Sequence, residues 1–302
     1  MFELLLLGKK NIINRSPGFG LVIAGQTNGG SSYTLVTEKY TYFNDVLVGG
    51  TSLDRNMNSA AGTGNTSVGV FFVATANRSY FYAANALTAN GALSHSAVYS
   101  GATSNQEIAF FQGSYNGYML TYTHATQSGV RNTVLSTGDT EIASAGTLTD
   151  GFFFGGMQYN YTYRHLLGTY KINYASQTKT SMANLGTARG YGAACFSAEK
   201  AYIGGGTSSP NTTGRTVETH QFSNEARSSG SELVYTHYHT ATAGNCDVGI
   251  FAGGENTAST GTGVKSVSKY TYATDVVSAG TLLSVARKYN AATSSSPGWV
   301  LP

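Results

Sequence analysis

Short aromatic or aliphatic runs that end in small residues or in Gly-Gly recur along the whole chain. They start at 18, 69, 109, 151, 201 and 249, so successive runs lie 40 to 51 residues apart. A short apolar run bounded by glycine is typical of a buried β-strand. A period of roughly 40 to 50 residues fits a unit of four short strands. The pattern therefore predicts repeated four-stranded sheets.

Two other kinds of segment accompany the apolar runs. Segments rich in Ala, Ser and Gly precede the later runs and recur near the C-terminus, at 59–62, 96–101, 143–146, 192–195, 240–244 and 290–293. Alternating aromatic segments follow the runs, as in Tyr40-Thr41-Tyr42 and Tyr80-Phe81-Tyr82. A period of two places both tyrosines on one face of a strand. We expect that face to pack against the neighbouring repeat, and the small side chains to belong to crowded inner strands.

An inner strand of small residues, an apolar second strand, an aromatic third strand and a variable outer strand describe one propeller blade. The sequence thus predicts an all-β fold, with residues 1–302 forming a single β-propeller. Residues 290–301 parallel residues 11–19. We therefore expect seven blades, with a closing blade split between the termini, and a six-bladed ring with the termini as arms is the alternative. Residues 1–10 are expected to form the closing strand or an anchoring arm. The residues expected to close the ring or anchor that arm are Phe2, Leu4, Leu5, Leu6, Leu7 and Trp299.

Composition narrows the class of protein further. Charged residues make up only 11% of the chain, against roughly 25% in an ordinary globular protein, while Gly (38) and Tyr (21) are abundant. The net charge of +3 comes from scattered single charges, so no nucleic-acid surface is expected. No run approaches the roughly 20 apolar residues of a membrane span, and Glu3 precedes the N-terminal leucines, which is unlike a secretory signal. The two cysteines, Cys195 and Cys246, are expected to be small core residues.

The clearest copy of the repeat has Gly253-Gly254, then Tyr270-Thr271-Tyr272 ahead of Asp275, then Leu283-Ser-Val-Ala-Arg287, and Leu185-Gly-Thr-Ala-Arg189 repeats the last element. These motifs resemble the repeats of kelch and galactose-oxidase propellers. Trp299 is the only tryptophan, so the outer-strand Trp of eukaryotic kelch repeats is missing, and a ubiquitin-ligase adaptor or actin binder is disfavoured. In its low charge and its richness in Tyr, Thr, Ala and Gly, the chain is most similar to kelch-like propeller proteins of tailed-phage virions. That resemblance implies a virion protein of the tail, collar, fibre base or capsid surface.

Candidate catalytic chemistry is sparse. His237 and His239 would share a strand face if their segment were regular, and imidazole pairs bind copper or zinc, but no third ligand is evident. Asp139 and Glu141 are close in sequence, and we expect them in a solvated turn. The chain has no Gly-x-Ser-x-Gly elbow and no phosphate-binding loop. We therefore predict a non-enzymatic protein without a metal or cofactor.

The remaining candidate is a binding surface on one rim of the ring. The segment 157–165 follows a Gly-Gly pair and is long and aromatic. Tyrosine and arginine are enriched where proteins bind partners, so the candidate patch is Tyr159, Tyr161, Tyr163, Arg164 and His165. The competing interpretation places its tyrosines in an early third strand between blades. The expected partners are other virion proteins. Two alternatives stay open, a host-attachment protein that binds cell-surface glycan and a galactose-oxidase-like enzyme.

Overall fold

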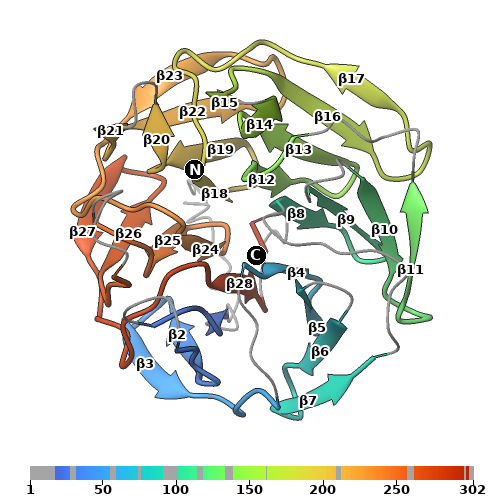
Figure 1. The fold of residues 1–302 in the computed structure, drawn as a ribbon, viewed down its shortest axis with the longest axis vertical. Helices are drawn as coiled ribbons and strands as arrows, with labels where there is room; N and C mark the ends of the chain where they lie inside the picture. The colour runs from blue at the N-terminus through green and yellow to red at the C-terminus, as the bar shows by residue number, and fades with distance from the viewer. Residues whose placement is uncertain are drawn as a thin grey trace, which may run out of the picture.

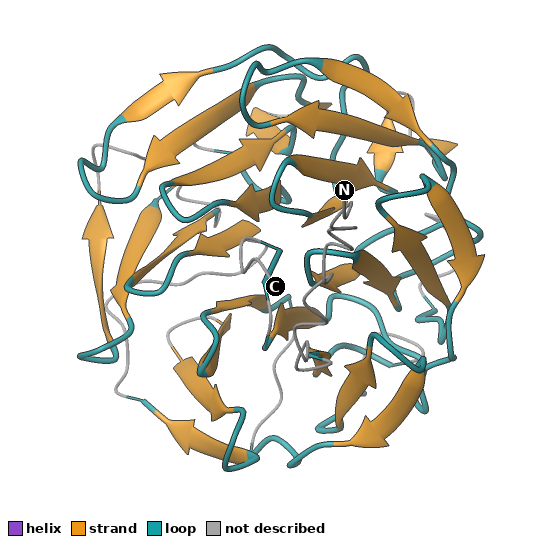
Figure 2. Ribbon diagram, turned by 180° about the vertical axis from the view of Figure 1, so that it is seen from behind, coloured by secondary structure: helices purple, strands orange, loops and turns teal. Residues whose placement is uncertain are grey.

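The computed structural model describes residues 18–27, 32–54, 59–73, 76–90, 101–113, 118–132, 139–160, 162–208, 212–256, 262–295 and 297–298. Within these ranges the regular elements are all strands joined by turns and loops, with no helix (Figure 2). The prediction of an all-β fold is confirmed. Residues 1–10, Tyr161 and Trp299 lie outside the described residues, so the predicted closing strand or arm does too.

The strands form six antiparallel sheets of four strands each. Blade 1 contains β28 (Ala291–Ser294), β1 (Phe19–Ile23), β2 (Thr37–Thr41) and β3 (Val46–Gly49). Blade 2 contains β4 (Ala61–Gly64), β5 (Val68–Val73), β6 (Ala76–Phe81) and β7 (Ala86–Ala89). Blade 3 contains β8 (Gly101–Ser104), β9 (Ile108–Gln112), β10 (Met119–Thr123) and β11 (Ser128–Asn132).

Blades 4 and 5 each carry an additional hairpin. Blade 4 contains β12 (Ala143–Gly146), β13 (Asp150–Phe154), β16 (Thr169–Asn173) and β17 (Lys179–Ser181), and its hairpin is β14 (Met157–Asn160) with β15 (Thr162–His165). Blade 5 contains β18 (Ala193–Phe196), β19 (Lys200–Gly204), β22 (Val217–Gln221) and β23 (Arg227–Gly230), and its hairpin is β20 (Thr207–Ser208) with β21 (Thr212–Thr213). Blade 6 contains β24 (Ala241–Gly244), β25 (Val248–Ala252), β26 (Val267–Thr271) and β27 (Val276–Ala279).

The six sheets are arranged radially as a closed β-propeller. The inner strands β28, β4, β8, β12, β18 and β24 each lie beside the next around the axis, and the outer strands form the rim (Figure 1). The expectation of seven blades is wrong and the six-bladed alternative is correct. The C-terminal half-repeat does not start another blade, because β28 pairs with β1 from Gly20↔Ser294 to Ile23↔Ala291 and so supplies the inner strand that the N-terminal repeat lacks.

Small hydroxyl residues tie the inner strands together around the channel. Each inner strand pairs with its own second strand on one side only, which leaves backbone groups at its other edge. Side-chain hydroxyls of the adjacent blade donate hydrogen bonds to carbonyl groups at this edge. Thr242 Oγ1 donates to the Ala194 carbonyl at 2.7 Å, and Ser144 Oγ donates to the Ala102 carbonyl at 2.7 Å. The expected crowding of small residues at the axis therefore has a hydrogen-bonding role as well.

The aromatic third strands pack between blades, as their alternation predicts. The Tyr82 hydroxyl lies 2.9 Å from Thr293 Oγ1 in blade 1, and the Tyr174 hydroxyl lies 2.8 Å from Thr103 Oγ1 in blade 3. All four residues are buried. Each ring thus removes a large apolar area from water while its polar tip is hydrogen-bonded across the blade interface.

In the Gly-Gly pairs that follow β13, β19 and β25, the backbone requires the second glycine. Gly156, Gly206 and Gly254 have φ of +102°, +75° and +94°, which L side chains rarely adopt. A Cβ on Gly254 would also lie 2.5 Å from the Tyr238 carbonyl oxygen of the preceding loop. The Gly-Gly turn after the second strand therefore lies directly against the loop that precedes the inner strand of the same blade. This contact lies at one mouth of the channel.

The arginines of the two Leu-x-x-x-Arg segments are buried and form ion pairs with glutamates on third strands. Arg287 pairs with Glu38 on β2, and Arg189 lies 3.8 Å from Glu218 on β22. Leu185 and Leu283, four residues earlier, are buried in the interblade cores. The Leu-x-x-x-Arg repeat therefore fixes the loop that leads into each of these blades.

Candidate functional site

Equivalent residues of five blades line one mouth of the central channel. Each stands two residues before the inner strand and has a left-handed φ between +52° and +58°, and they are Ser59, Glu141, Tyr191, His239 and Tyr289. The equivalent position of blade 3 lies outside the described residues. Non-glycine residues in this conformation are uncommon and cluster at functional sites. The same conformation recurs in the turns between the third and fourth strands, at Asp45, Asn85, Gln127, Gln177, Glu225 and Asp275, so it is a repeated feature of the blades.

Backbone hydrogen bonds connect these residues from blade to blade. Tyr289 N–H donates to the His239 carbonyl at 3.2 Å, His239 N–H to the Tyr191 carbonyl at 3.3 Å, and Tyr191 N–H to the Glu141 carbonyl at 3.3 Å. Ser59 N–H donates to the Tyr289 carbonyl at 3.1 Å. We call Ser59, Glu141, Tyr191, His239 and Tyr289 the mouth ring. Tyr191, His239 and Tyr289 have main-chain bonds to ring neighbours on both sides, and Ser59 and Glu141 each have one, so these bonds hold the backbone of the ring in place.

Aromatic rings enclose His239 within the mouth ring. The centroid of its imidazole lies 3.9 Å from those of Tyr238 and Tyr289 and 4.2 Å from that of Tyr191. The His239 side chain is only 4% exposed, whereas the three tyrosines are half-buried. Three partly exposed tyrosine rings therefore surround one buried imidazole.

Charged groups flank the same imidazole. Glu141 Oε1 and Glu255 Oε1 each lie 4.0 Å from a ring nitrogen of His239, and Lys288 Nζ lies 2.5 Å from Glu255 Oε1. Burial lowers the pKa of His239 well below its ordinary value, and the positive charge of Lys288 adds to this, so the imidazole is neutral. Burial raises the pKa of Glu141 to about 8, so this carboxyl is largely protonated at neutral pH.

Repeated backbone bridges place these side chains. Tyr238 and Glu255 exchange backbone hydrogen bonds of 3.1 and 2.7 Å, and Lys288 and Gln26 exchange bonds of 3.0 and 2.8 Å. In each bridge one residue directly precedes the mouth ring and the other directly follows a glycine with positive φ, Gly254 or Gly25. The turn at Gly253-Gly254 therefore places Glu255 at the mouth.

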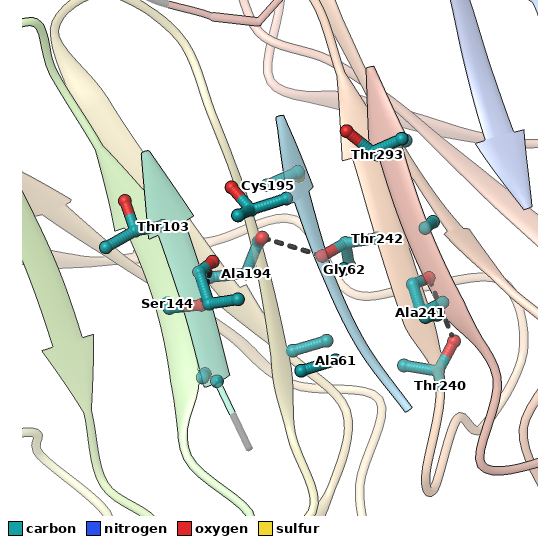
Figure 3. A pocket seen from close by; sticks show the side chains of 18 of the residues that line it. Ala61, Gly62, Thr103, Ser144, Ala194, Cys195, Thr240, Ala241, Thr242 and Thr293 are labelled. Carbon is teal, nitrogen blue, oxygen red and sulfur yellow. Dashed lines mark hydrogen bonds between the residues drawn. The ribbon is translucent and has the colours of Figure 1, made fainter. Parts of the chain in front are cut away.

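Below the mouth the channel is lined by the inner strands. Its cavity has a volume of about 150 Å³, and the mouth-ring residues line it together with small residues such as Ala61, Ser144 and Thr242. Figure 3 shows these strands side by side, with the Thr242 hydroxyl bonded to Ala194. Among the residues that line the described part of the channel, the charged and tyrosine residues lie at the mouth end, whereas Phe196 lies at the opposite end of β18.

The predicted patch at 157–165 forms the β14–β15 hairpin rather than an early third strand. The third strand is β16, and the hairpin pairs Tyr159 with Tyr163 outside the blade sheet. Arg164 is exposed, whereas His165 is buried and lies 2.7 Å from Thr207 Oγ1 of blade 5. Met157 exchanges backbone hydrogen bonds with Thr140. The hairpin is therefore tied at its base to two neighbouring elements.

The two histidines singled out in the sequence do not act as a pair. The segment 235–239 is irregular, so His237 and His239 do not share a strand face. His237 is fully buried, with its ring nitrogens 2.9 Å from the Gly253 carbonyl and from Ser268 Oγ. Within the described ranges no group of three or more His, Cys, Asp or Glu side chains is arranged to hold a metal. Of the cysteines, Cys195 is a buried core residue as expected, and Cys246 is only half-buried.

Sequence reasoning missed most of the mouth. It singled out Glu141 and His239 for other roles and overlooked Tyr191, Lys288 and Tyr289. A signal was available, because Tyr191 and Tyr289 each stand two residues after the arginine of a Leu-x-x-x-Arg segment. This spacing, compared between the two repeats, would have identified these two members of the ring.

Comparison with known proteins supports the fold alone. No protein-family model matches the chain, and no curated protein matches it. Among solved structures, the one described as "Structure of YjhT" is similar with a TM-score of 0.68 at 12% identity, over 80% of this chain and 88% of that one. At this identity the likeness shows a shared architecture, and with the six sheets it defines the chain as a six-bladed β-propeller. The described residues include no helical stretch with the length and apolar character that a membrane crossing requires.

Proposed function

We propose that this protein is a non-enzymatic interaction module that binds other structural proteins of a tailed-phage virion. The observation that carries the proposal is the β14–β15 hairpin, which stands outside the blade sheets, is anchored at its base and carries the exposed Arg164. A rigid ring with a firmly held projecting hairpin suits rigid display, in which little conformational entropy is lost on binding. The virion setting is supported by the resemblance of the repeats to kelch-like phage propellers.

The galactose-oxidase-like alternative receives less support from the site. Cys195 and Tyr272 share a buried core cluster between blades 5 and 6, but the described residues bring no set of histidines to them. The kelch-type Leu-x-x-x-Arg segments perform a structural task in this chain, because Arg189 and Arg287 are buried in ion pairs. A binding role accounts for these features more simply than oxidase chemistry does.

The experiment is a mass-spectrometric census of purified phage particles, followed by incorporation of a hairpin variant. Replacing Tyr159, Tyr163 and Arg164 together by alanine removes the candidate contacts but leaves the anchor His165 in place. We expect wild-type chain in particles and a reduced copy number for the variant. The control is Phe43→Ala, which removes an aromatic side chain that is 86% exposed in the β2–β3 turn. Absence from particles, or equal incorporation of all three proteins, would contradict the proposal.

A further inference from the structure

Two tyrosines at the mouth of the channel lie in ring contact although they belong to different blades. Tyr191 stands in the loop before β18 of blade 5, and Tyr238 stands in the loop before β24 of blade 6. Their ring centroids are 4.6 Å apart, and the two planes are inclined by 49°. At this separation carbon atoms of the two rings are in van der Waals contact.

The hydroxyl ends of the two rings also meet. The Tyr191 and Tyr238 hydroxyls share a hydrogen bond, and burial together with the neighbouring Tyr191 raises the pKa of Tyr238 above its ordinary value, so this phenol is protonated at neutral pH. In a phenol the ortho carbons are next to the carbon that carries the oxygen. The contact between the hydroxyl ends therefore brings ortho carbons of the two rings close together.

Both rings are also reachable from solvent, because Tyr191 and Tyr238 are only half-buried. Tyr202 and Tyr272 are as close, with centroids 4.5 Å apart, but they are only 5% and 9% exposed. Among the tyrosine pairs in ring contact within the described ranges, Tyr191 and Tyr238 alone combine contact with exposure of both rings.

Main-chain hydrogen bonds hold both tyrosines in this arrangement. Tyr238 exchanges bonds of 3.1 and 2.7 Å with Glu255. The Tyr191 N–H donates to the Glu141 carbonyl at 3.3 Å, and the His239 N–H donates to the Tyr191 carbonyl at 3.3 Å. Groups that are held in contact react far more readily with each other than the same groups free in solution.

We propose that Tyr191 and Tyr238 are a modification site, at which a one-electron oxidant couples the two side chains into a dityrosine cross-link. Each phenol gives one electron to an equivalent of the oxidant and one proton to water, and becomes a phenoxyl radical. The unpaired electron is shared by the oxygen and by the ortho and para carbons. The para carbon already carries Cβ, so one ortho carbon of each ring forms the new C–C bond. The hydrogen of each bonded ortho carbon then restores the hydroxyl of its ring.

The cross-link would join the loops that lead into blades 5 and 6. It would limit the freedom of the unfolded chain in the way that a disulfide does, so the coupled protein should be more stable than the untreated one. The site uses no residue of the β14–β15 hairpin and goes beyond the proposed interaction role.

The test is photo-oxidation of the folded full chain at low protein concentration, with tris(bipyridyl)ruthenium as the oxidant and persulfate as the final electron acceptor. Proteolysis and mass spectrometry follow. We expect a monomeric product that has lost two hydrogen atoms, shows dityrosine fluorescence and links a peptide containing Tyr191 to one containing Tyr238. This product should unfold at a higher urea concentration than the untreated chain. In unfolding urea the yield of this link should fall by about tenfold, because the contact is lost.

Conservative variants locate the coupling. Tyr191→Phe and Tyr238→Phe each keep the ring and remove one phenol, so each should lose this link, and either one suffices if the other fails to fold. The matched control is Tyr289→Phe, which changes a mouth tyrosine whose ring contact within the described ranges is with His239. It should form the link in the same yield as the wild type.

Three results would overturn the inference. They are the absence of a link between Tyr191 and Tyr238 in the folded chain, an equal yield of that link in unfolding urea, and a higher yield for the buried pair of Tyr202 and Tyr272.

The outcomes are independent of the proposed function. A chain that is incorporated into particles through its hairpin but forms no such link refutes the modification site alone. A chain that forms the link but is absent from particles refutes the virion role alone.

Discussion

The buried pair of Arg287 and Glu38 offers the sharpest test of how the ring is held together. Both side chains are almost completely buried, at 0% and 2% exposure. Arg287 Nη1 also donates to the Val36 carbonyl at 2.9 Å, and Glu38 accepts from Ser284 N–H at 2.7 Å. The pair thus joins the loop before β28 to the third strand of the blade that both ends of the chain build.

Glu38→Gln keeps the shape of the side chain but removes its charge. The Arg287 guanidinium is then left buried without a counter-ion, and breaking a buried pair in this way costs about 3–5 kcal/mol. The matched control is Glu232→Gln, which breaks the pair of Glu232 with Arg215 at 3.4 Å, where both side chains are about half exposed. Exposed pairs contribute roughly 0–1 kcal/mol, so Glu38→Gln should lose severalfold more unfolding free energy than Glu232→Gln.

Urea unfolding measures both losses of unfolding free energy when its dependence on urea concentration has the same slope in each variant. A loss for Glu38→Gln no larger than that for Glu232→Gln would refute the argument. A second comparison keeps the test independent of packing defects. Glu38→Leu combined with Arg287→Met removes both charges, so it should be more stable than Glu38→Gln alone, because no unpaired charge remains.

Three further predictions follow from local geometry. Gly254→Ala should lower the free energy of unfolding by about 1–3 kcal/mol, because Gly254 has a positive φ and the new Cβ would meet a carbonyl oxygen. The control is Gly49→Ala, which should change it by less than about 0.5 kcal/mol in the same urea assay, because nothing lies within 4 Å of the new Cβ. Similar losses for the two variants would contradict the close-approach argument. Burial lowers the pKa of His237 from 6.5 to about 4. The unfolded chain therefore binds a proton that the fold does not, so stability should fall by up to about 3 kcal/mol as the pH drops from 6.5 to 4, and His237→Gln should show a shallower pH dependence; an unchanged slope would show that another group is responsible. Burial raises the pKa of the Cys195 thiol to about 12. A thiol reagent should therefore modify only the half-buried Cys246 in the native protein, and both cysteines after unfolding. Rapid labelling of both cysteines in the native protein would contradict the buried position of Cys195.

Much of the architecture follows from spacing in the sequence. The apolar runs coincide with β1, β5, β9, β13, β19 and β25, the second strands of the six blades. The tyrosine alternation correctly places both rings of a pair at an interblade surface, because a strand shows only two faces and one is buried against the next blade. These features are local, so the order of residues along one repeat is enough to reveal them.

The number of blades depends on a contact that local pattern does not contain. Residues 290–293 read as the beginning of a repeat, and only the pairing of β28 with β1 assigns them to the first blade. The same holds for the mouth, where Glu141, Tyr191, His239 and Tyr289 come from four separate loops. Sequence determines the strands and turns because these depend on near neighbours. Ring closure and the site at its axis were decided by tertiary structure, since they arise where residues roughly one repeat or more apart meet.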